Sequence, residues 1–169
     1  MKQGEEKMER IVDIYGNCAN FDEMYQPEDS WYGQILVDKN QIFEGVIEDY
    51  NQRNMFYVCG KITPEELSVY RLAREGVQLP HHFVGEKDKK DGRFYGIDAV
   101  TNLFMDIPVG EVKMSLRPAD KTRSETAMER DYIRQRIELV QATLDDESLG
   151  ILYQFRNDRK QINAATAEK

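Results

Sequence analysis

Cysteine and histidine are scarce in this 169-residue sequence. Its two cysteines, Cys18 and Cys59, lie far apart in the chain and are too few for a disulfide framework or a cysteine-based metal site. The two histidines, His81 and His82, are adjacent, so on a strand they face opposite sides and cannot chelate one ion together. We therefore expect reduced thiols, surface or edge histidines, and neither a metal nor another cofactor.

Long apolar runs are also missing. No stretch approaches the roughly 20 consecutive apolar residues of a membrane-spanning helix, and residues 1–16 lack the apolar run of a signal peptide. Lysine and arginine total 23 against 31 aspartates and glutamates, which gives a formal net charge of −8. Such a balance disfavours nucleic acid and anionic membranes as partners. We expect a cytoplasmic protein without a membrane anchor.

The chain has the length of one domain, residues 1–169, and can bury its own core. Residues 1–25 form an N-terminal segment with no predicted element. Between residues 30 and 118, short aromatic and β-branched runs predict seven strands, at 31–38, 41–50, 55–62, 67–73, 81–88, 92–101 and 111–118. Short links at 38–40, 51–54, 63–65 and 89–92, of which Asp91-Gly92 is the strongest turn signal, predict consecutive hairpins and therefore an antiparallel meander.

Glycines recur inside these strands. In five of the seven, an apolar residue stands two positions before a glycine; these glycines are Gly33, Gly45, Gly60, Gly85 and Gly96. Glycine within a strand permits sharp coiling and lets a bulky neighbour pack over bare backbone. The pattern predicts a sheet that curls and closes into a barrel, with the aromatic–glycine face inside and a polar face outside.

The C-terminal third changes to a helical period. Residues Thr122 to Glu125 have the sequence of a capping box, and an apolar stripe follows at Ile133, Ile137, Val140 and Leu144, which predicts a helix over 122–145. Residues 148–156 fit either a final strand or a short helix, and the alternation of Ile151, Tyr153 and Phe155 favours the strand. We expect residues 157–169 to form a frayed tail. The fold class is therefore mainly β (α+β), with one long C-terminal helix.

This order of elements resembles the calycin superfamily, the lipocalin-like barrels that bind small ligands. The resemblance covers residues 30–156 and rests on Trp31 in the first predicted strand, the glycine-rich antiparallel meander, the following helix and Arg156 near the end. It implies a barrel around a ligand cavity, with Arg156 covering the Trp31 ring in a cation–π contact.

The candidate ligand-binding residues share the predicted inner face. They are Trp31, Phe43, Phe56, Phe83 and Phe94, with Asp98 in phase with Phe94 and Gly96. An inward carboxylate needs a partner or a ligand. Asp98 is therefore either a polar anchor in the cavity, a residue at the barrel mouth, or the partner of an internal arginine such as Arg71 or Arg93. Glu44 and Glu48 share the other face, where a solvated pair is expected rather than a catalytic one.

Three functions are compatible with these observations. The first is a non-catalytic barrel that binds a small apolar molecule. The second is a structural or regulatory protein-interaction domain with a filled core, which binds a protein partner or a second copy through its surface. The outward-facing Tyr32, Tyr57 and Tyr95 either form an exposed aromatic patch for this purpose or support the helix. The third is an enzyme that uses inward carboxylates. No nucleophile and base pair can be named for it, and the missing G-x-S-x-G, Walker-type and G-x-G-x-x-G motifs count against nucleotide-dependent enzymes.

Overall fold

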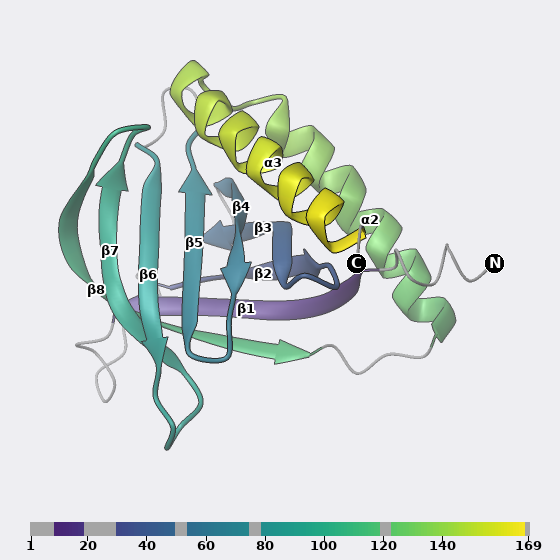
Figure 1. The fold of residues 1–169 in the computed structure, drawn as a ribbon, viewed down its shortest axis with the longest axis horizontal. Helices are drawn as coiled ribbons and strands as arrows, with labels where there is room; N and C mark the ends of the chain where they lie inside the picture. The colour runs from purple at the N-terminus through teal and green to yellow at the C-terminus, as the bar shows by residue number, and fades with distance from the viewer. Residues whose placement is uncertain (1–8, 19–29, 50–53, 75–78, 119–122, 168–169) are drawn as a thin grey trace.

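Eight antiparallel strands close into one barrel, and two helices cross one side of it (Figure 1). The computed structural model describes residues 9–18, 30–49, 54–74, 79–118 and 123–167. The strands are β1 (Arg10–Cys18), β2 (Trp31–Val37), β3 (Ile42–Asp49), β4 (Met55–Ile62), β5 (Glu66–Leu72), β6 (His81–Lys87), β7 (Phe94–Thr101) and β8 (Asp106–Pro118); the helices are α2 (Arg123–Gln141) and α3 (Asp146–Ala167). The predicted meander and its closure into a barrel are confirmed.

The strand that closes the barrel was not predicted. β1 lies in the N-terminal segment and pairs with β2 on one side and with β8 on the other, as in Ile14↔Gly33 and Ile14↔Leu116. Its alternation is hard to detect in sequence because Ile11 packs under a helix while the next residue, Val12, packs inside the barrel. The eight-stranded antiparallel barrel is consistent with a calycin-like architecture, and membership of that superfamily stays a prediction.

The hairpin links follow the turn signals. The links at 38–40, 63–65 and 89–92 are confirmed, and Gly92 takes a positive φ of 74° that suits glycine. The link at 51–54 lies largely outside the part of the chain that the structure describes, and so does Thr122, the first residue of the predicted capping box.

The barrel interior is a packed apolar core. As the glycine phase predicted, the inward side chains come from alternate positions of every strand: Val12, Ile14, Ile35, Val37, Phe43, Ile47, Phe56, Val58, Leu67, Val69, Phe83, Phe94 and Met114. Trp31 packs at the edge of this cluster, and a Cβ placed on Gly16 would lie 2.3 Å from its ring. Glycine is required there because the indole lies directly on the backbone of β1.

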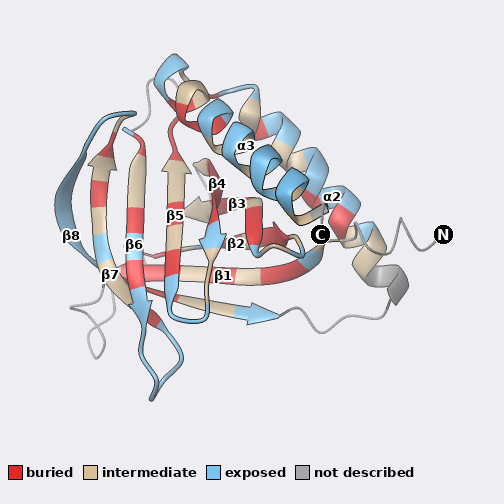
Figure 2. Cartoon of the chain, in the orientation of Figure 1, coloured by how far each residue is buried: buried red, intermediate tan, exposed pale blue. Residues whose placement is uncertain are grey.

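A second core lies outside the barrel, beneath the helices (Figure 2). Outward residues of the strands, including Val46, Tyr57 and Cys59, are buried against Val140 and Leu152 of the helices. The expectation of a polar outer face is therefore wrong for this side of the barrel. Two layers of side chains, one inside and one outside, enclose β3 and β4.

The segment after α2 forms a helix, so the preference for a strand at 148–156 is wrong. The frayed tail expected from residue 157 is wrong as far as Ala167, and residues 168–169 lie outside the described part of the chain. α3 runs from Asp146 to Ala167, and the Asp145 carboxylate accepts a hydrogen bond of 2.8 Å from the Ser148 amide, which caps its first turn. Ile151 and Leu152 are buried while Tyr153 is 57% exposed, a helical pattern rather than an alternating one. The expected helix of 122–145 ends earlier, at Gln141, so two helices take the place of one.

Candidate functional site

The predicted ligand-binding residues meet inside the barrel, but little space remains between them. Phe43, Phe56, Phe83 and Phe94 are all buried in the inner core. The cavity at the end near Trp31 and Asp98 has a volume of about 20 Å³. Small-molecule sites in proteins usually measure about 300–1,000 Å³. This end of the interior therefore has the dimensions of a filled core. A pocket of about 360 Å³ lies at the opposite end of the barrel, where Val12, Phe94 and Leu116 line it.

Asp98 points inward as predicted, and its partner is a histidine. The Asp98 carboxylate lies 2.6 Å from His81 Nδ1, and the two side chains are 22% and 18% exposed at this end of the barrel. Arg71 lies near them, with its guanidinium 5.0 Å from the centre of the Phe56 ring. Burial lowers the pKa of Arg71, and the nearby Asp98 carboxylate opposes that shift. Arg71, one of the two arginines expected as a partner, is thus a neighbour of Asp98, and the Asp98 carboxylate forms a hydrogen bond with His81.

His82 faces the outside of the barrel, as its position next to His81 predicted. Its Nδ1 lies 2.9 Å from the Asp106 carboxylate and its Nε2 lies 2.8 Å from the Ser68 hydroxyl. The imidazole also stacks on the Tyr70 ring at 4.0 Å between centroids. Burial alone would raise the pKa of Asp106, but hydrogen bonds from Thr101 and His82 outweigh it and lower that pKa. Sequence reasoning missed this cluster because strand register alone brings positions 68, 82 and 106 together.

The turn between β7 and β8 exposes three consecutive apolar side chains. Leu103, Phe104 and Met105, named here the apolar tip, are 52%, 93% and 58% exposed. The Asn102 side chain holds their backbone, since its Oδ1 accepts hydrogen bonds from the amides of Phe104 at 2.7 Å and Met105 at 3.0 Å. Thr101 binds the carboxylate of Asp106 at the other end of the turn. The apolar tip is therefore presented by an ordered turn.

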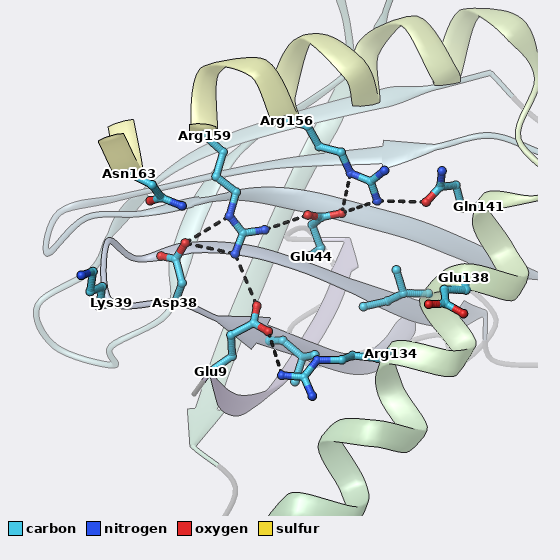
Figure 3. Close-up of a pocket in the computed structure, with 12 residues that line it drawn as sticks. Glu9, Asp38, Lys39, Glu44, Arg134, Glu138, Gln141, Arg156, Arg159 and Asn163 are labelled. Atoms are coloured by element: carbon cyan, nitrogen blue, oxygen red, sulfur yellow. Dashed lines mark hydrogen bonds and ion pairs between the residues drawn. The ribbon is translucent and has the colours of Figure 1, made fainter. Parts of the chain in front are cut away.

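A groove of about 800 Å³ separates the helices from the rim of the barrel (Figure 3). At its centre, the Arg159 guanidinium contacts three carboxylates: Glu44 at 2.7 Å, Asp38 at 3.0 Å and Glu9 at 3.3 Å. Burial alone would lower the pKa of Arg159, but these carboxylates together raise it. The charges of both signs neutralise one another, so we interpret the groove as the anchor of α3 on the barrel.

Arg156 belongs to the same network and does not cover Trp31. It donates hydrogen bonds to Glu44 at 3.0 Å and to the Tyr57 hydroxyl at 2.8 Å, and its guanidinium lies 6.0 Å from the centre of the Tyr57 ring. The implied cation–π contact with Trp31 is therefore wrong, because the helix carries Arg156 along the outside of the barrel while Trp31 packs at the edge of the inner core.

Two further expectations for the outer face, a solvated carboxylate pair and an exposed tyrosine patch, are wrong because the helices cover part of this face. Glu44 and Glu48 are not a solvated pair, since Glu44 binds the α3 arginines and Glu48 binds Arg136 of α2 at 2.5 Å. Tyr57 is fully buried, while Tyr32 is 47% exposed. Tyr95 donates a hydrogen bond of 2.6 Å to Asp91. The three tyrosines therefore do not share one exposed surface.

Cys59 lies in the outer core with no exposed surface, and burial raises the pKa of its thiol well above the usual value. A raised native pKa contributes stability below the unfolded-state pKa of about 8.5, and this contribution is lost as pH rises above that value. We expect the free energy of unfolding to fall between pH 8 and pH 10, by up to about 1.4 kcal/mol per pH unit for this one proton. Urea denaturation across this range measures the slope. Cys59→Ala should flatten it, and an unchanged slope in that variant would assign the effect to another group.

Comparisons with known proteins add no assignment to this geometry. No group of three or more histidine, cysteine, aspartate or glutamate side chains within the described ranges could hold a metal ion. Among the same residues, neither helix is both long and apolar enough to span a membrane. No family model, curated protein or solved structure matches the chain.

Proposed function

We propose that this chain is a protein-interaction domain in which a filled barrel presents the apolar tip to a partner protein. The observation that carries the proposal is Phe104, whose 93% exposed ring is held by an ordered turn between Leu103 and Met105. Aromatic anchors on rigid supports supply much of the binding energy in protein interfaces, because little conformational entropy is lost when they bind. The cavity of about 20 Å³ near Trp31 and Asp98 favours this function over storage of a small apolar ligand between those two residues.

Charge around the tip indicates the kind of partner. The charged residue next to the tip is the acidic Asp106, and the chain as a whole carries a net charge of −8. A second copy or an anionic membrane would be repelled at this surface. The surface instead suits a protein with an apolar pocket and a basic rim, and such binding weakens as salt concentration rises.

Photo-crosslinking tests this function directly. With benzoylphenylalanine in place of Phe104, we expect one defined adduct with a different protein in cells of the source organism, and less of it at high salt. The matched control carries the same group in place of Met128, which is 73% exposed on α2. An adduct between two copies of this chain would show that the tip mediates self-association, and it would contradict the proposed partner. Equal adducts at positions 104 and 128, or none, would contradict the proposal.

Phe104→Ser provides the complementary test. Because the ring touches so little of the domain, we expect the free energy of unfolding to change by less than about 0.5 kcal/mol while the partner is lost. Co-purification of the identified partner and urea denaturation measure the two effects. A large loss of stability in Phe104→Ser would show that the ring serves the fold instead.

A further inference from the structure

We propose that Ser68, His82 and Asp106 form a nucleophilic triad on the outer face of the barrel that hydrolyses small esters with an apolar acyl group. Each side chain lies within hydrogen-bond distance of the atom that it must contact in this chemistry. The Ser68 hydroxyl is 2.8 Å from Nε2 of His82, and the opposite ring nitrogen, Nδ1, is 2.9 Å from the Asp106 carboxylate. A serine, a histidine and a carboxylate in this order are recognised by geometry, on unrelated folds and without a shared sequence motif.

The hydrogen bonds determine which ring nitrogen of His82 carries the proton and which one accepts a hydrogen bond from Ser68. The Asp106 carboxylate is ionised at neutral pH because its pKa is lowered, so it can only accept a hydrogen bond. Nδ1 of His82 must then carry the proton, which leaves Nε2 of the neutral ring as an acceptor. The Ser68 hydroxyl therefore donates its proton to Nε2. This is the arrangement in which histidine acts as a general base on a serine nucleophile.

Packing keeps the imidazole in this orientation. His82 is 12% exposed, and its ring lies nearly parallel to the Tyr70 ring, with 7° between the two planes. Thr101 holds the second oxygen of the Asp106 carboxylate. These contacts leave the imidazole able to exchange a proton with Ser68 without a change of rotamer. Such preorganisation lowers the cost of reaching the transition state.

Strand register also places a substrate surface beside the serine. Val84 lies directly across from Ser68, and Ile97 lies directly across from Val84, so the two form one outward-facing row. They are 39% and 43% exposed and can cover an apolar acyl chain. On the other side of Ser68, its cross-strand neighbour is the exposed Lys61. Cβ atoms of such neighbours are about 5 Å apart, so the lysine charge can stabilise an oxyanion that forms near Ser68.

The reaction balances without any further cofactor. Ser68 Oγ bonds to the carbonyl carbon of the ester while its proton passes to Nε2 of His82, and the carbonyl oxygen becomes an oxyanion near Lys61. The C–O bond to the alcohol then breaks, and the alcohol leaves with the proton from Nε2. Water repeats the sequence on the acyl-serine, giving up one proton to Nε2, and releases the carboxylic acid while Ser68 regains its proton.

A fluorophosphonate probe and p-nitrophenyl butyrate test the triad on the full chain. Peptide mass spectrometry should locate the phosphonyl group on Ser68, and Ser68→Ala should abolish it. His82→Gln should slow both labelling and ester hydrolysis by about 100-fold or more. His81→Gln is the matched control, since His81 is on the same strand but points to the opposite face of the sheet, where it contacts Asp98 of β7, and it should leave both rates within about twofold.

The results decide the proposal in either direction. Label on another residue, equal labelling of His82→Gln and the unsubstituted chain, or unchanged hydrolysis in Ser68→Ala would each overturn it. Thermal melts followed by circular dichroism show whether His82→Gln is folded. If it is not, Asp106→Asn replaces it, because a side chain that is 45% exposed can be changed without loss of the fold, and the same slowing is expected.

Discussion

Replacing Arg159 with methionine should lower the free energy of unfolding by about 3 kcal/mol, because the change leaves three partly buried carboxylates without their shared cation. Arg159 and its partners Glu44 and Asp38 have side chains that are 16%, 14% and 14% exposed. Removing one member of such a cluster costs more than the cluster contributes overall, since the remaining charges stay desolvated. Urea denaturation measures the loss. Hydrogen exchange should show α3 opening before the barrel strands, because Arg159 ties that helix to β3.

Arg134→Met is the matched control for this prediction. Arg134 lines the same groove and also contacts Glu9, at 3.2 Å, but its side chain is 45% exposed. An ion pair this accessible to water contributes about 0–1 kcal/mol. Similar losses in the two variants would show that the network around Arg159 does not anchor α3. A loss confined to Arg159→Met would show that burial of the network, rather than the number of charges, stabilises the packed helix.

Replacing Gly96 with alanine should destabilise the barrel by about 3 kcal/mol, at the upper end of the range for overpacking. A Cβ at this position would lie 1.9 Å from the Val84 carbonyl oxygen and 2.4 Å from the Cα of Gly85 on the neighbouring strand. Both are backbone atoms, so no side chain can rotate away, and β6 and β7 must separate to make room. Thermal and urea denaturation measure the effect, and circular dichroism reports whether the strands still form.

Gly110→Ala separates this close approach from the general effect of adding a methyl group to a strand. Gly110 lies on β8, across from Asp98, and a Cβ placed there meets no atom within 4 Å. We expect this variant to be neutral or slightly more stable, because alanine reduces the conformational freedom of the unfolded chain. If both glycines tolerate alanine equally, the inward glycines are not needed for the curvature of the sheet.

The barrel was largely predictable from local pattern. A period of two assigns each strand residue to one of two faces, and glycines in phase with aromatic residues indicated which face curls inward; the inner core agrees at Phe43, Phe83 and Met114. The prediction failed where both faces of an element are buried. β1 is the clearest example, because Ile11 and Val12 are buried on opposite sides and leave no polar alternation.

The C-terminal third shows a second reason why local sequence pattern can predict the wrong element. The alternation of Ile151, Tyr153 and Phe155 is compatible with a strand, but a barrel that is already closed offers no edge for a ninth strand to pair with. The same residues form α3, which buries Ile151 and Leu152 on the outside of the sheet. Tertiary contact, rather than local preference, therefore decided this element.

The sequence by itself determined seven of the eight strands, their hairpin order, the inward phase of Asp98 and the opposite directions of His81 and His82, because all of these follow from the period of a strand and from turn chemistry. Only the tertiary structure decided which side chains meet. Barrel closure and strand register bring Ser68, His82 and Asp106 within hydrogen-bond distance, and helix packing brings Arg159 to Glu44. Contacts between residues this far apart in the chain depend on register and packing, which local sequence patterns do not encode.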